Sequence, residues 1–468
     1  MFKFAMRFLV AVALPFAAAS AQQQPHTINY APAKSITLSL PAKLDIAVAA
    51  KGLARPRFFA QAPDGRIFVT SMNNLADNTR GAIYLLDGWD AETHSFTRVV
   101  PYLQHLRNPN NIAFYTDEAK QIWLYVPLTD KLVRYRYTPG ADAPTGPPQV
   151  LIRFPDYGLN YKYGGWHLTR TVAVAALHGR TRIYIATGSS CNYCREREAV
   201  RASVTVMDPN GSHQRIVAHG LRNAVDLRFI PELDRGALFA TNMGDDHLGD
   251  KLPEDTFFEL DANAHAGPIA AATAPNYGWP TCYFAGGKAT LDTTPLPENP
   301  GPEARVIAPK PVTTDQPDDS VYGKQNGVAA AGTNLAAQVH ANANVPTLGP
   351  VPEPLTTCKD VPPAYTTFAA HSSPLGMAYF PASDSTVGNA FLVALHGAGH
   401  PRIGTGYRVV RIATADHRPQ DFITGFLTRE AGKPVVHGRP CGLLRIGPDS
   451  FLLTDDKLGL IYAVFPKR

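Results

Sequence analysis

Short apolar runs separated by turn-forming residues recur along most of the chain. Each recurring unit contains an apolar strand, a turn, a second strand, a loop and a third strand. The Pro-Asp-Gly turn at 63–65 and the Gly-Pro-Asp turn at 447–449 are typical of connections between neighbouring strands. The first strands of the six units are predicted at 58–60, 112–114, 172–174, 226–229, 377–380 and 443–446. The third strands are predicted at 82–86, 131–135, 203–207, 257–260, 407–411 and 460–464.

The spacing of the units predicts the architecture. The second strands begin at Arg66, Ile122, Arg182, Ala237, Ala390 and Ser450. The units are therefore about 55 to 60 residues apart, except for one interval that is longer by about 95. Six sheets of three or four strands predict an all-β fold, a six-bladed β-propeller over 51–468 with an N-terminal arm at 22–50. A β-sandwich or two smaller all-β domains are the alternative, because strand patterns alone do not close a ring.

The long interval contains a segment at 284–367 that is rich in Ala, Pro, Thr and Asn. It follows neither the helical nor the strand period, so we interpret it as an irregular insertion on one face of the propeller. The 41 prolines and 37 glycines of the whole chain are consistent with a fold made of many turns.

The N-terminus has the pattern of a secretory signal peptide over 1–21. Lys3 and Arg7 precede an apolar run at 8–19, and small residues follow at 19–21. The run is shorter than the roughly 20 residues that span a bilayer. We therefore expect no membrane span and a periplasmic or secreted protein; a retained anchor is the alternative.

Export would allow the five cysteines to form disulfides. Cys191 and Cys194 are close enough in sequence to pair locally, and Cys282 could pair with Cys358 at the two ends of the insertion. Cys441 would then be a buried free thiol. A zinc site at Cys191 and Cys194 is the alternative, although a lone Cys-x-x-Cys pair is a weak zinc pattern.

Charge favours a small-molecule partner over nucleic acid. The net charge of +5 is spread along the 468 residues and forms no basic stripe. Polar residues that could take part in catalysis or ligand binding lie instead in the loops that lead into the predicted first strands. In a propeller, such loops meet at the central channel.

The first of these loops is the segment Gly-Gly-Trp-His-Leu-Thr-Arg at 164–170. A neutral imidazole accepts a proton readily near pH 7, so His167 is a candidate general base. Trp166 beside it is a candidate substrate contact. The alternative for His167 is a purely structural hydrogen bond.

The fourth unit has two such loops. Arg222, followed by Asn223, offers a charged fork of donors suited to a carboxylate or a developing oxyanion, or alternatively to an ion pair between blades. The loop at 242–255 contains five acidic residues and Gly244, which is a ligand chemistry that calcium prefers. A solvated acidic loop is the alternative, because the loop lacks the spacing of an EF-hand.

The last two units add basic loops at 395–402 and 438–442, which contain His396, Arg402 and Arg439. Histidine, arginine and carboxylate side chains from four blades would form a polar channel mouth. Such a mouth could hold an anionic cofactor bridged by a metal ion.

Six motifs together resemble the PQQ-dependent glucose/sorbosone dehydrogenase family. They occur in the family's order over most of the chain after the signal peptide, at 164–170, 188–194, 220–223, 249–253, 276–280 and 371–376. The resemblance implies a six-bladed propeller that binds pyrroloquinoline quinone (PQQ) and Ca2+. It also implies oxidation of a sugar or sugar aldehyde by hydride transfer to the quinone.

The resemblance also implies roles for individual residues. His167 corresponds to the general base, Arg222 to the donor that stabilises the reduced quinone oxygen with Asn223 beside it, and Gly244 and Asp245 to the calcium site. The basic residues His396, Arg439 and Arg402 are candidate cofactor contacts.

Some positions depart from the soluble glucose dehydrogenase branch. His396 stands where that branch has a lysine, and only Arg439 matches its pair of arginines; both departures favour the sorbosone-like branch. A glutamine that contacts sugar has no clear match, and Asn110 and Asn111 are positional candidates for it.

The Cys-x-x-Cys pair is followed by Arg195 instead of the histidine of a haem motif, so we expect an external electron acceptor such as a periplasmic cytochrome or a quinone. A carbohydrate-binding propeller without catalysis or a calcium-dependent lactonase is the alternative function.

Overall fold

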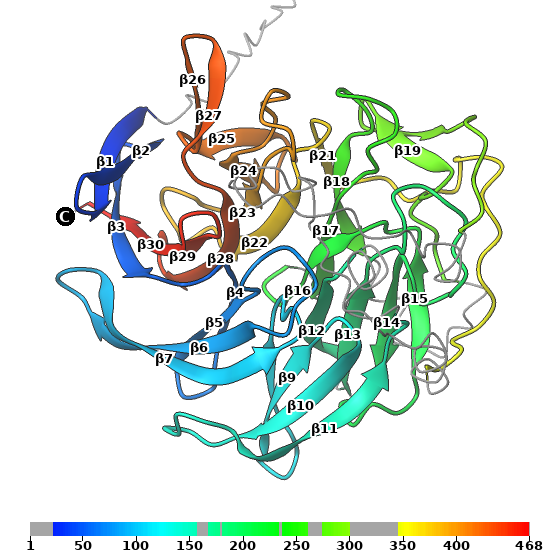
Figure 1. Cartoon of the computed structure of the whole chain (residues 1–468), viewed down its shortest axis with the longest axis horizontal. Helices are drawn as coiled ribbons and strands as arrows, with labels where there is room; N and C mark the ends of the chain where they lie inside the picture. The colour runs from blue at the N-terminus through cyan, green and yellow to red at the C-terminus, as the bar shows by residue number, and fades with distance from the viewer. Residues whose placement is uncertain are drawn as a thin grey trace, which may run out of the picture.

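A computed structural model describes residues 22–156, 167–177, 180–233, 236–260, 274–299 and 345–467. All regular secondary structure in these ranges is β, apart from turns and bends. Six four-stranded antiparallel sheets lie around a common axis in chain order (Figure 1). The prediction of an all-β, six-bladed propeller is confirmed. Over the same ranges, no helix is long and apolar enough to cross a membrane.

The first three blades follow the chain without interruption. Blade 1 contains β4 (Pro56–Gln61), β5 (Ile67–Ser71), β6 (Gly81–Asp90) and β7 (Ser95–Leu106). Blade 2 contains β8 (Ala113–Thr116), β9 (Ile122–Pro127), β10 (Lys131–Tyr137) and β11 (Thr145–Arg153). Blade 3 contains β12 (Arg170–Leu177), β13 (Arg180–Thr187), β14 (Ser203–Met207) and β15 (Arg215–His219).

Blades 4 and 6 each include one strand that is distant in sequence, whereas blade 5 again follows the chain. Blade 4 contains β16 (Ala224–Ile230), β17 (Ala237–Asn242), β18 (Asp255–Leu260) and β21 (Thr366–Phe368). Blade 5 contains β22 (Pro374–Phe380), β23 (Ala390–Leu395), β24 (Arg408–Ala413) and β25 (Pro419–Ile423). Blade 6 contains β28 (Pro440–Gly447), β29 (Ser450–Asp455), β30 (Leu460–Pro466) and β3 (Leu44–Lys51).

Every predicted first, second and third strand overlaps a strand of the structure, but the outer strands were not predicted. In blade 2, β11 is mostly exposed and contains two consecutive prolines, so it lacks the alternating pattern of a half-buried strand. In blade 6, the outer strand is β3, which pairs antiparallel with β30. All of β3 except Lys51 lies in the predicted N-terminal arm at 22–50, and the structure shows that this strand closes the ring.

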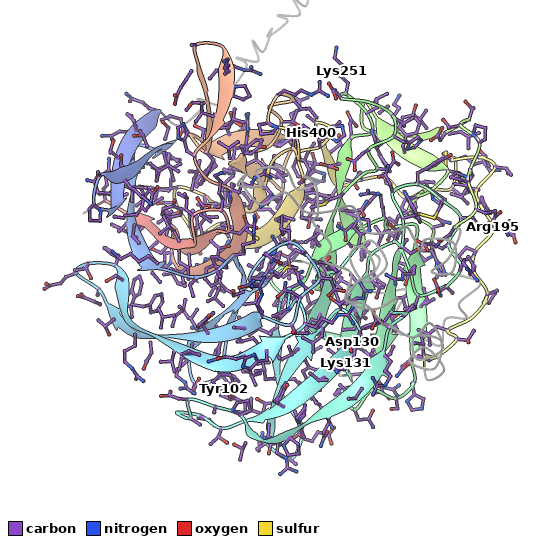
Figure 2. All side chains as sticks on the ribbon, viewed as in Figure 1. Tyr102, Asp130, Lys131, Arg195, Lys251 and His400 are labelled. Atoms are coloured by element: carbon purple, nitrogen blue, oxygen red, sulfur yellow. A yellow bond between two sulfur atoms is a disulfide. The ribbon has the colours of Figure 1, made fainter. Side chains whose placement is uncertain are left out.

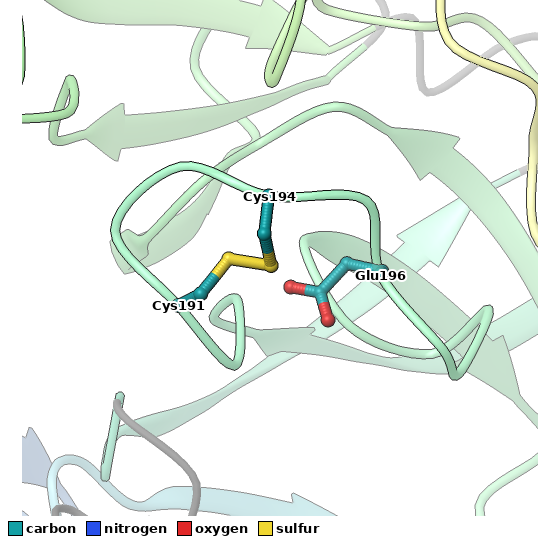
Figure 3. A group of neighbouring side chains, drawn as sticks. All are labelled: Cys191, Cys194 and Glu196. Atoms are coloured by element: carbon teal, nitrogen blue, oxygen red, sulfur yellow. A yellow bond between two sulfur atoms is a disulfide. The ribbon is translucent and has the colours of Figure 1, made fainter. Parts of the chain in front are cut away.

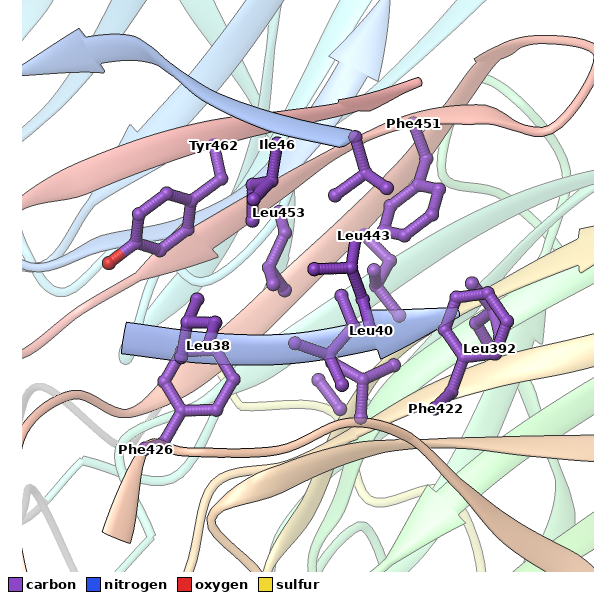
Figure 4. Packing of buried hydrophobic residues seen from close by; sticks show 14 of the residues in the cluster. Leu38, Leu40, Ile46, Leu392, Phe422, Phe426, Leu443, Phe451, Leu453 and Tyr462 are labelled. Atoms are coloured by element: carbon purple, nitrogen blue, oxygen red, sulfur yellow. The ribbon is translucent and has the colours of Figure 1, made fainter. Parts of the chain in front are cut away.

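The hydrophobic core lies between neighbouring blades, where apolar faces of adjacent sheets pack together. One cluster joins blades 5 and 6 to the hairpin of β1 (Gln23–Ala31) and β2 (Lys34–Pro41) (Figure 4). Leu38 and Leu40 of this hairpin are fully buried against Phe426 and Tyr462. The hairpin β26 (Leu427–Glu430) and β27 (Lys433–Val436) projects next to it (Figure 1). The N-terminal arm therefore covers apolar surface as well as closing the ring.

Both predicted disulfides are present. Cys191 is bonded to Cys194 and Cys282 to Cys358, while Cys441 is a buried free thiol. Because the sulfurs of Cys191 and Cys194 are bonded to each other, they are not thiolate ligands, and the zinc alternative is not supported. The described part of the insertion contains a hairpin of β19 (Cys282–Ala285) and β20 (Lys288–Leu291). Residues 300–344 lie outside the described ranges.

Candidate functional site

The inner strands of all six blades begin at the same end of the propeller, so the loops that precede them share one face. These loops place Asn111 before β8, His167 before β12, Asn223 before β16 and Arg439 before β28. Trp166, the predicted substrate contact, lies outside the described residues together with the rest of 157–166.

His167 is held in one tautomer by its neighbour in the next loop. Its Nδ1 lies 2.9 Å from the carbonyl oxygen of Ser189 and 3.0 Å from the Ser189 hydroxyl. That hydroxyl donates its own proton to the carbonyl oxygen of Cys191, so it can only accept from the imidazole. Nδ1 therefore carries the proton, and Nε2 is the basic nitrogen.

The electrostatic surroundings keep His167 neutral. Burial lowers its pKa well below the usual value of a histidine, and the positive charge of Arg222 acts in the same direction. A neutral imidazole with a fixed tautomer is the state that a general base requires at neutral pH.

Gly188 allows this close packing. A Cβ atom at position 188 would lie 2.7 Å from Cβ of His167 and 2.7 Å from Oδ1 of Asn223. Arg170, which is fully buried, holds the main chain from the other side by donating from Nη1 to the carbonyl oxygen of His167 at 2.8 Å. His167 and Asn223 are therefore brought together, as the sequence predicted for a shared site.

Arg222 is buried, with 1% of its surface exposed, and its guanidinium is oriented by three acceptors. Nε donates to the carbonyl oxygen of Asn192 at 3.0 Å, and Nη2 donates to Oδ1 of the same residue at 2.7 Å. Nη1 donates to the carbonyl oxygen of Gly244 at 2.7 Å. Nη2 also lies 3.6 Å from Oδ2 of Asp246. An arginine has five N–H donors, so the second N–H of Nη1 is left for a ligand while the orientation is fixed.

The acidic loop is ordered by contacts among its own residues. Gly244 donates its N–H to Oδ1 of the buried Asp255 at 2.8 Å, and burial raises the pKa of Asp255 to about 7. Asp246 lies 3.0 Å from Nδ1 of His371, and this hydrogen bond raises the pKa of His371 to about 9. Asp245 and Asp255 are buried, whereas Asp246 and Glu254 are half-buried and Asp250 is exposed, so the loop is solvated only in part.

Asp245 has the chemistry of a cation ligand. Its Oδ1 is buried and forms an ion pair with Nδ1 of His247 at 2.6 Å. His247 donates from Nε2 to Oδ2 of Asp292 at 2.7 Å and stacks on the ring of Tyr193. The buried carboxylate of Asp245 and the carbonyl oxygen of the neighbouring Gly244 are the oxygen ligands that a hard cation such as Ca2+ prefers.

A cationic cluster lies where blades 1, 5 and 6 meet. The buried Asp456 accepts from Nε2 of His396 at 2.8 Å and from Nη1 of Arg57 at 3.2 Å, and Arg55 lies 3.6 Å away. Burial lowers the pKa of His396 to about 4, so this histidine is neutral. Arg439 donates to Nδ1 of His396 at 3.3 Å.

Positive charge exceeds negative charge in this cluster. The guanidinium groups of Arg55 and Arg57 lie near the carboxylate of Asp456, and that of Arg439 contacts His396 beside it. Asp455 accepts from the main-chain N–H of Arg439, and burial raises the pKa of Asp455 to about 7. In addition, Nε of Arg57 is buried without a hydrogen bond. The cluster therefore fits an anionic ligand, including a cofactor that carries carboxylates.

Sequence reasoning missed Arg55 and Arg57. Arg55 immediately precedes β4, so it occupies in blade 1 the place that Arg439 occupies in blade 6. The guanidinium of Arg439 donates hydrogen bonds to the carbonyl oxygens of Gly397 and Ala398 and to the Tyr407 hydroxyl. A comparison of equivalent positions in all six units would have found Arg55.

The asparagine candidates hold the inner strands together. The Asn110 amide donates to the Thr171 hydroxyl at 2.9 Å and to the Val225 carbonyl oxygen at 3.0 Å, and its Oδ1 accepts from Arg57 at 3.3 Å. Asn110 thus contacts blades 1, 3 and 4 and lies on the axis. Asn111 forms a two-point contact with the main chain of Val172.

Among the described residues, Arg402 contacts only the exposed end of the acidic loop. Its guanidinium is 70% exposed and pairs with Asp250 at 3.1 Å, and the Asp250 side chain is 52% exposed. The residues that the structure brings together are therefore His167, Arg222, Asn223 and the acidic loop on one side, and His396 and Arg439 on the other.

A separate cavity lies away from the axis, near Arg195 at the edge of the molecule (Figure 2). It is lined by Glu196, Arg201, His219 and Trp279 among others. Burial raises the pKa of Glu196 to about 7, and Ser190 donates to both of its oxygens. Glu196 lies beside the Cys191–Cys194 disulfide, whose bonded sulfurs are not available to a metal (Figure 3).

Comparisons with known proteins show the fold. No protein-family model and no curated protein sequence matches the chain. Among solved structures, the PQQ domain of a pyranose dehydrogenase from Coprinopsis cinerea in its holo form is similar with a TM-score of 0.58 and 18% identity, over 93% of this chain and 98% of that chain.

Two further structures are similar over comparable lengths. A carbohydrate-active enzyme of family AA12 from Trichoderma reesei gives a TM-score of 0.58 at 15% identity, over 92% of this chain and 97% of that chain. A glucose dehydrogenase gives a TM-score of 0.50 at 11% identity, over 91% and 100%. The chain therefore shares the propeller fold of these structures.

Proposed function

We propose that the protein is a PQQ- and calcium-dependent oxidoreductase that oxidises a sugar or sugar aldehyde and passes the electrons to an external acceptor. One observation carries this proposal: a neutral histidine of fixed tautomer and a buried, oriented arginine share one hydrogen-bonded network. The network runs from His167 through Ser189, whose N–H donates to the carbonyl oxygen of Arg222 at 2.7 Å.

Each part of the site supports a separate requirement of that chemistry. The quinone, when bound, supplies the acceptor for a hydride. His167 would remove the substrate hydroxyl proton at Nε2, while Arg222 would stabilise negative charge on an oxygen near its remaining donor. Gly244 and Asp245 would hold Ca2+, and the excess positive charge around Arg55, Arg57 and Arg439 would hold the carboxylates of PQQ.

The proposal extends to substrate and location. Departures from the glucose branch at His396 and Arg439 favour a sorbosone-like sugar aldehyde over glucose. Two disulfides agree with a periplasmic or secreted protein. A periplasmic cytochrome or a quinone would receive the electrons.

Reconstitution tests the function. Protein prepared without cofactor is mixed with PQQ and Ca2+, together and singly, and dye reduction is followed with a panel of aldoses and sugar aldehydes. We expect activity only with both additions, and its loss in His167→Ala. Failure of PQQ to raise the thermal midpoint would overturn the proposal and leave a binding propeller or a lactonase-type hydrolase.

A further inference from the structure

Asn192 joins two parts of the proposed site. Its Oδ1 accepts from Nη2 of Arg222 at 2.7 Å and from the N–H of Asp246 at 3.0 Å. Its carbonyl oxygen accepts from Nε of Arg222 at 3.0 Å. A single residue thus directs two of the three nitrogen atoms of the Arg222 guanidinium and fixes the start of the acidic loop.

The position of Asn192 is itself fixed by its neighbours. It lies within the loop closed by the Cys191–Cys194 disulfide, and both cysteines are buried against Ala202 and Trp279. Nε1 of Trp279 donates to the Asn192 carbonyl oxygen at 3.2 Å. A covalent bond and an indole hydrogen bond therefore restrict the main chain on both sides of the acceptors that Arg222 uses.

The same loop also reaches the proposed base. The Ser189 hydroxyl, which contacts Nδ1 of His167, donates to the carbonyl oxygen of Cys191 at 2.6 Å. The loop at 189–194 therefore forms hydrogen bonds with His167 on one side and with Arg222 on the other. Groups held in this way lose little conformational freedom when a ligand binds, and their dipoles need no reorganisation during reaction.

We propose that Asn192 is a positioning residue, which orients Arg222 toward the cofactor and couples that orientation to the loop at 244–246. This inference rests on the proposed function. Asn192 does not itself contact substrate in this role; it acts through Arg222. A rotation of the guanidinium in its absence would misplace the donor that faces the quinone oxygen.

The test compares Asn192→Leu, which removes Oδ1 and fills its space, with Asn210→Leu. Asn210 is an exposed loop residue whose Oδ1 also accepts a main-chain N–H, that of Ser212. For Asn192→Leu we expect PQQ to bind about tenfold more weakly and kcat to fall about 10- to 100-fold with a nearly unchanged KM. Asn210→Leu should match the wild type in each measurement.

A double-mutant cycle shows whether Asn192 acts through Arg222. PQQ affinity is measured by protein fluorescence or thermal shift for Asn192→Leu, Arg222→Ala and the double variant. We expect Asn192→Leu to cause no further loss when Arg222 is already removed. The same fold loss in both backgrounds would show an independent structural role and overturn the proposal.

Two controls separate the possible failures. The thermal midpoint without PQQ shows whether Asn192→Leu folds. If it does not, Trp279→Phe takes its place; it removes the indole donor and part of the ring, and a smaller loss is expected. If the wild-type protein does not bind PQQ in these measurements, the proposed function is overturned, and this inference with it. A wild type that binds PQQ, beside an Asn192→Leu variant with unchanged affinity and kcat, overturns the positioning role alone.

Discussion

Nδ1 of His167 lies 2.9 Å from the carbonyl oxygen of Ser189. Because a carbonyl oxygen can only accept, this contact assigns the imidazole proton to Nδ1 without any carboxylate partner. A main-chain acceptor orients the ring but adds less basicity than a carboxylate would. The proposed base is therefore a weak, neutral imidazole, and its protonation behaviour follows from burial and from Arg222.

The pH dependence of turnover should show this. Since the pKa of His167 is lowered well below 6.5, the base stays deprotonated and active as the pH falls from 8 to 6.5. We expect the acid limb of the kcat/KM profile to lie below pH 6.5. An acid limb centred at 6.5 or higher would show that the imidazole is not shielded as the structure indicates.

Gly188 should tolerate no side chain. In Gly188→Ala the new Cβ would lie 2.7 Å from both His167 and Asn223, so one of them must move. We expect kcat to fall about 100-fold while the fold is retained. Gly447→Ala is the matched control, because its Cβ would meet nothing closer than 3.8 Å, and its activity should equal that of the wild type. Equal kcat in the two variants would refute the packing argument.

His371 should make stability depend on alkaline pH. Its folded pKa of about 9 is above the unfolded value of 6.5, so its contribution is complete below pH 6.5 and is lost as the pH rises through about 9. In calcium-free buffer, we expect the wild type to lose more unfolding free energy than His371→Gln between pH 6.5 and 10. Parallel urea-unfolding curves for the two proteins across that range would count against the Asp246 contact.

The two disulfides should differ in their effect on stability. Cys282 and Cys358 are 76 residues apart, so their bond restricts the unfolded chain far more than the bond across three residues at Cys191. We expect serine replacement to cost about 4 kcal/mol for the long loop and about 2 kcal/mol for the short one. Chemical denaturation measures both, and the reverse order would show that native-state contacts dominate.

Cofactor affinity should distinguish the arginines. Arg55 belongs to the buried cluster with excess positive charge, whereas Arg402 is paired with Asp250 at the surface. We expect Arg55→Gln to weaken PQQ binding about tenfold and Arg402→Gln to change it less than twofold. Titration of both variants with PQQ measures the two affinities. A larger loss of affinity in Arg402→Gln than in Arg55→Gln would support Arg402 as the cofactor contact.

Local patterns were sufficient for much of the propeller. Most of the inner three strands in each blade are buried and bounded by turns, so alternation and turn residues located them. Outer strands such as β11 are exposed and carry weaker patterns. In blade 6 the outer strand comes from the opposite end of the chain, which no local pattern can reveal.

The sequence by itself determined the number of blades, the cysteines close enough to pair, and the loops that carry His167, Arg222 and the acidic residues, because turns and apolar periods are local properties. Only the tertiary structure decided which charged groups are already satisfied and which remain for a ligand. Arg57 and Asp456 are 399 residues apart and meet only when the ring closes. Because closure of the ring sets hydrogen-bond partners at such separations, the cluster of Arg55 and Arg57 could be found only in the structure. The same holds for the contacts of Asn192 with Arg222 and Asp246, from which we proposed its positioning role.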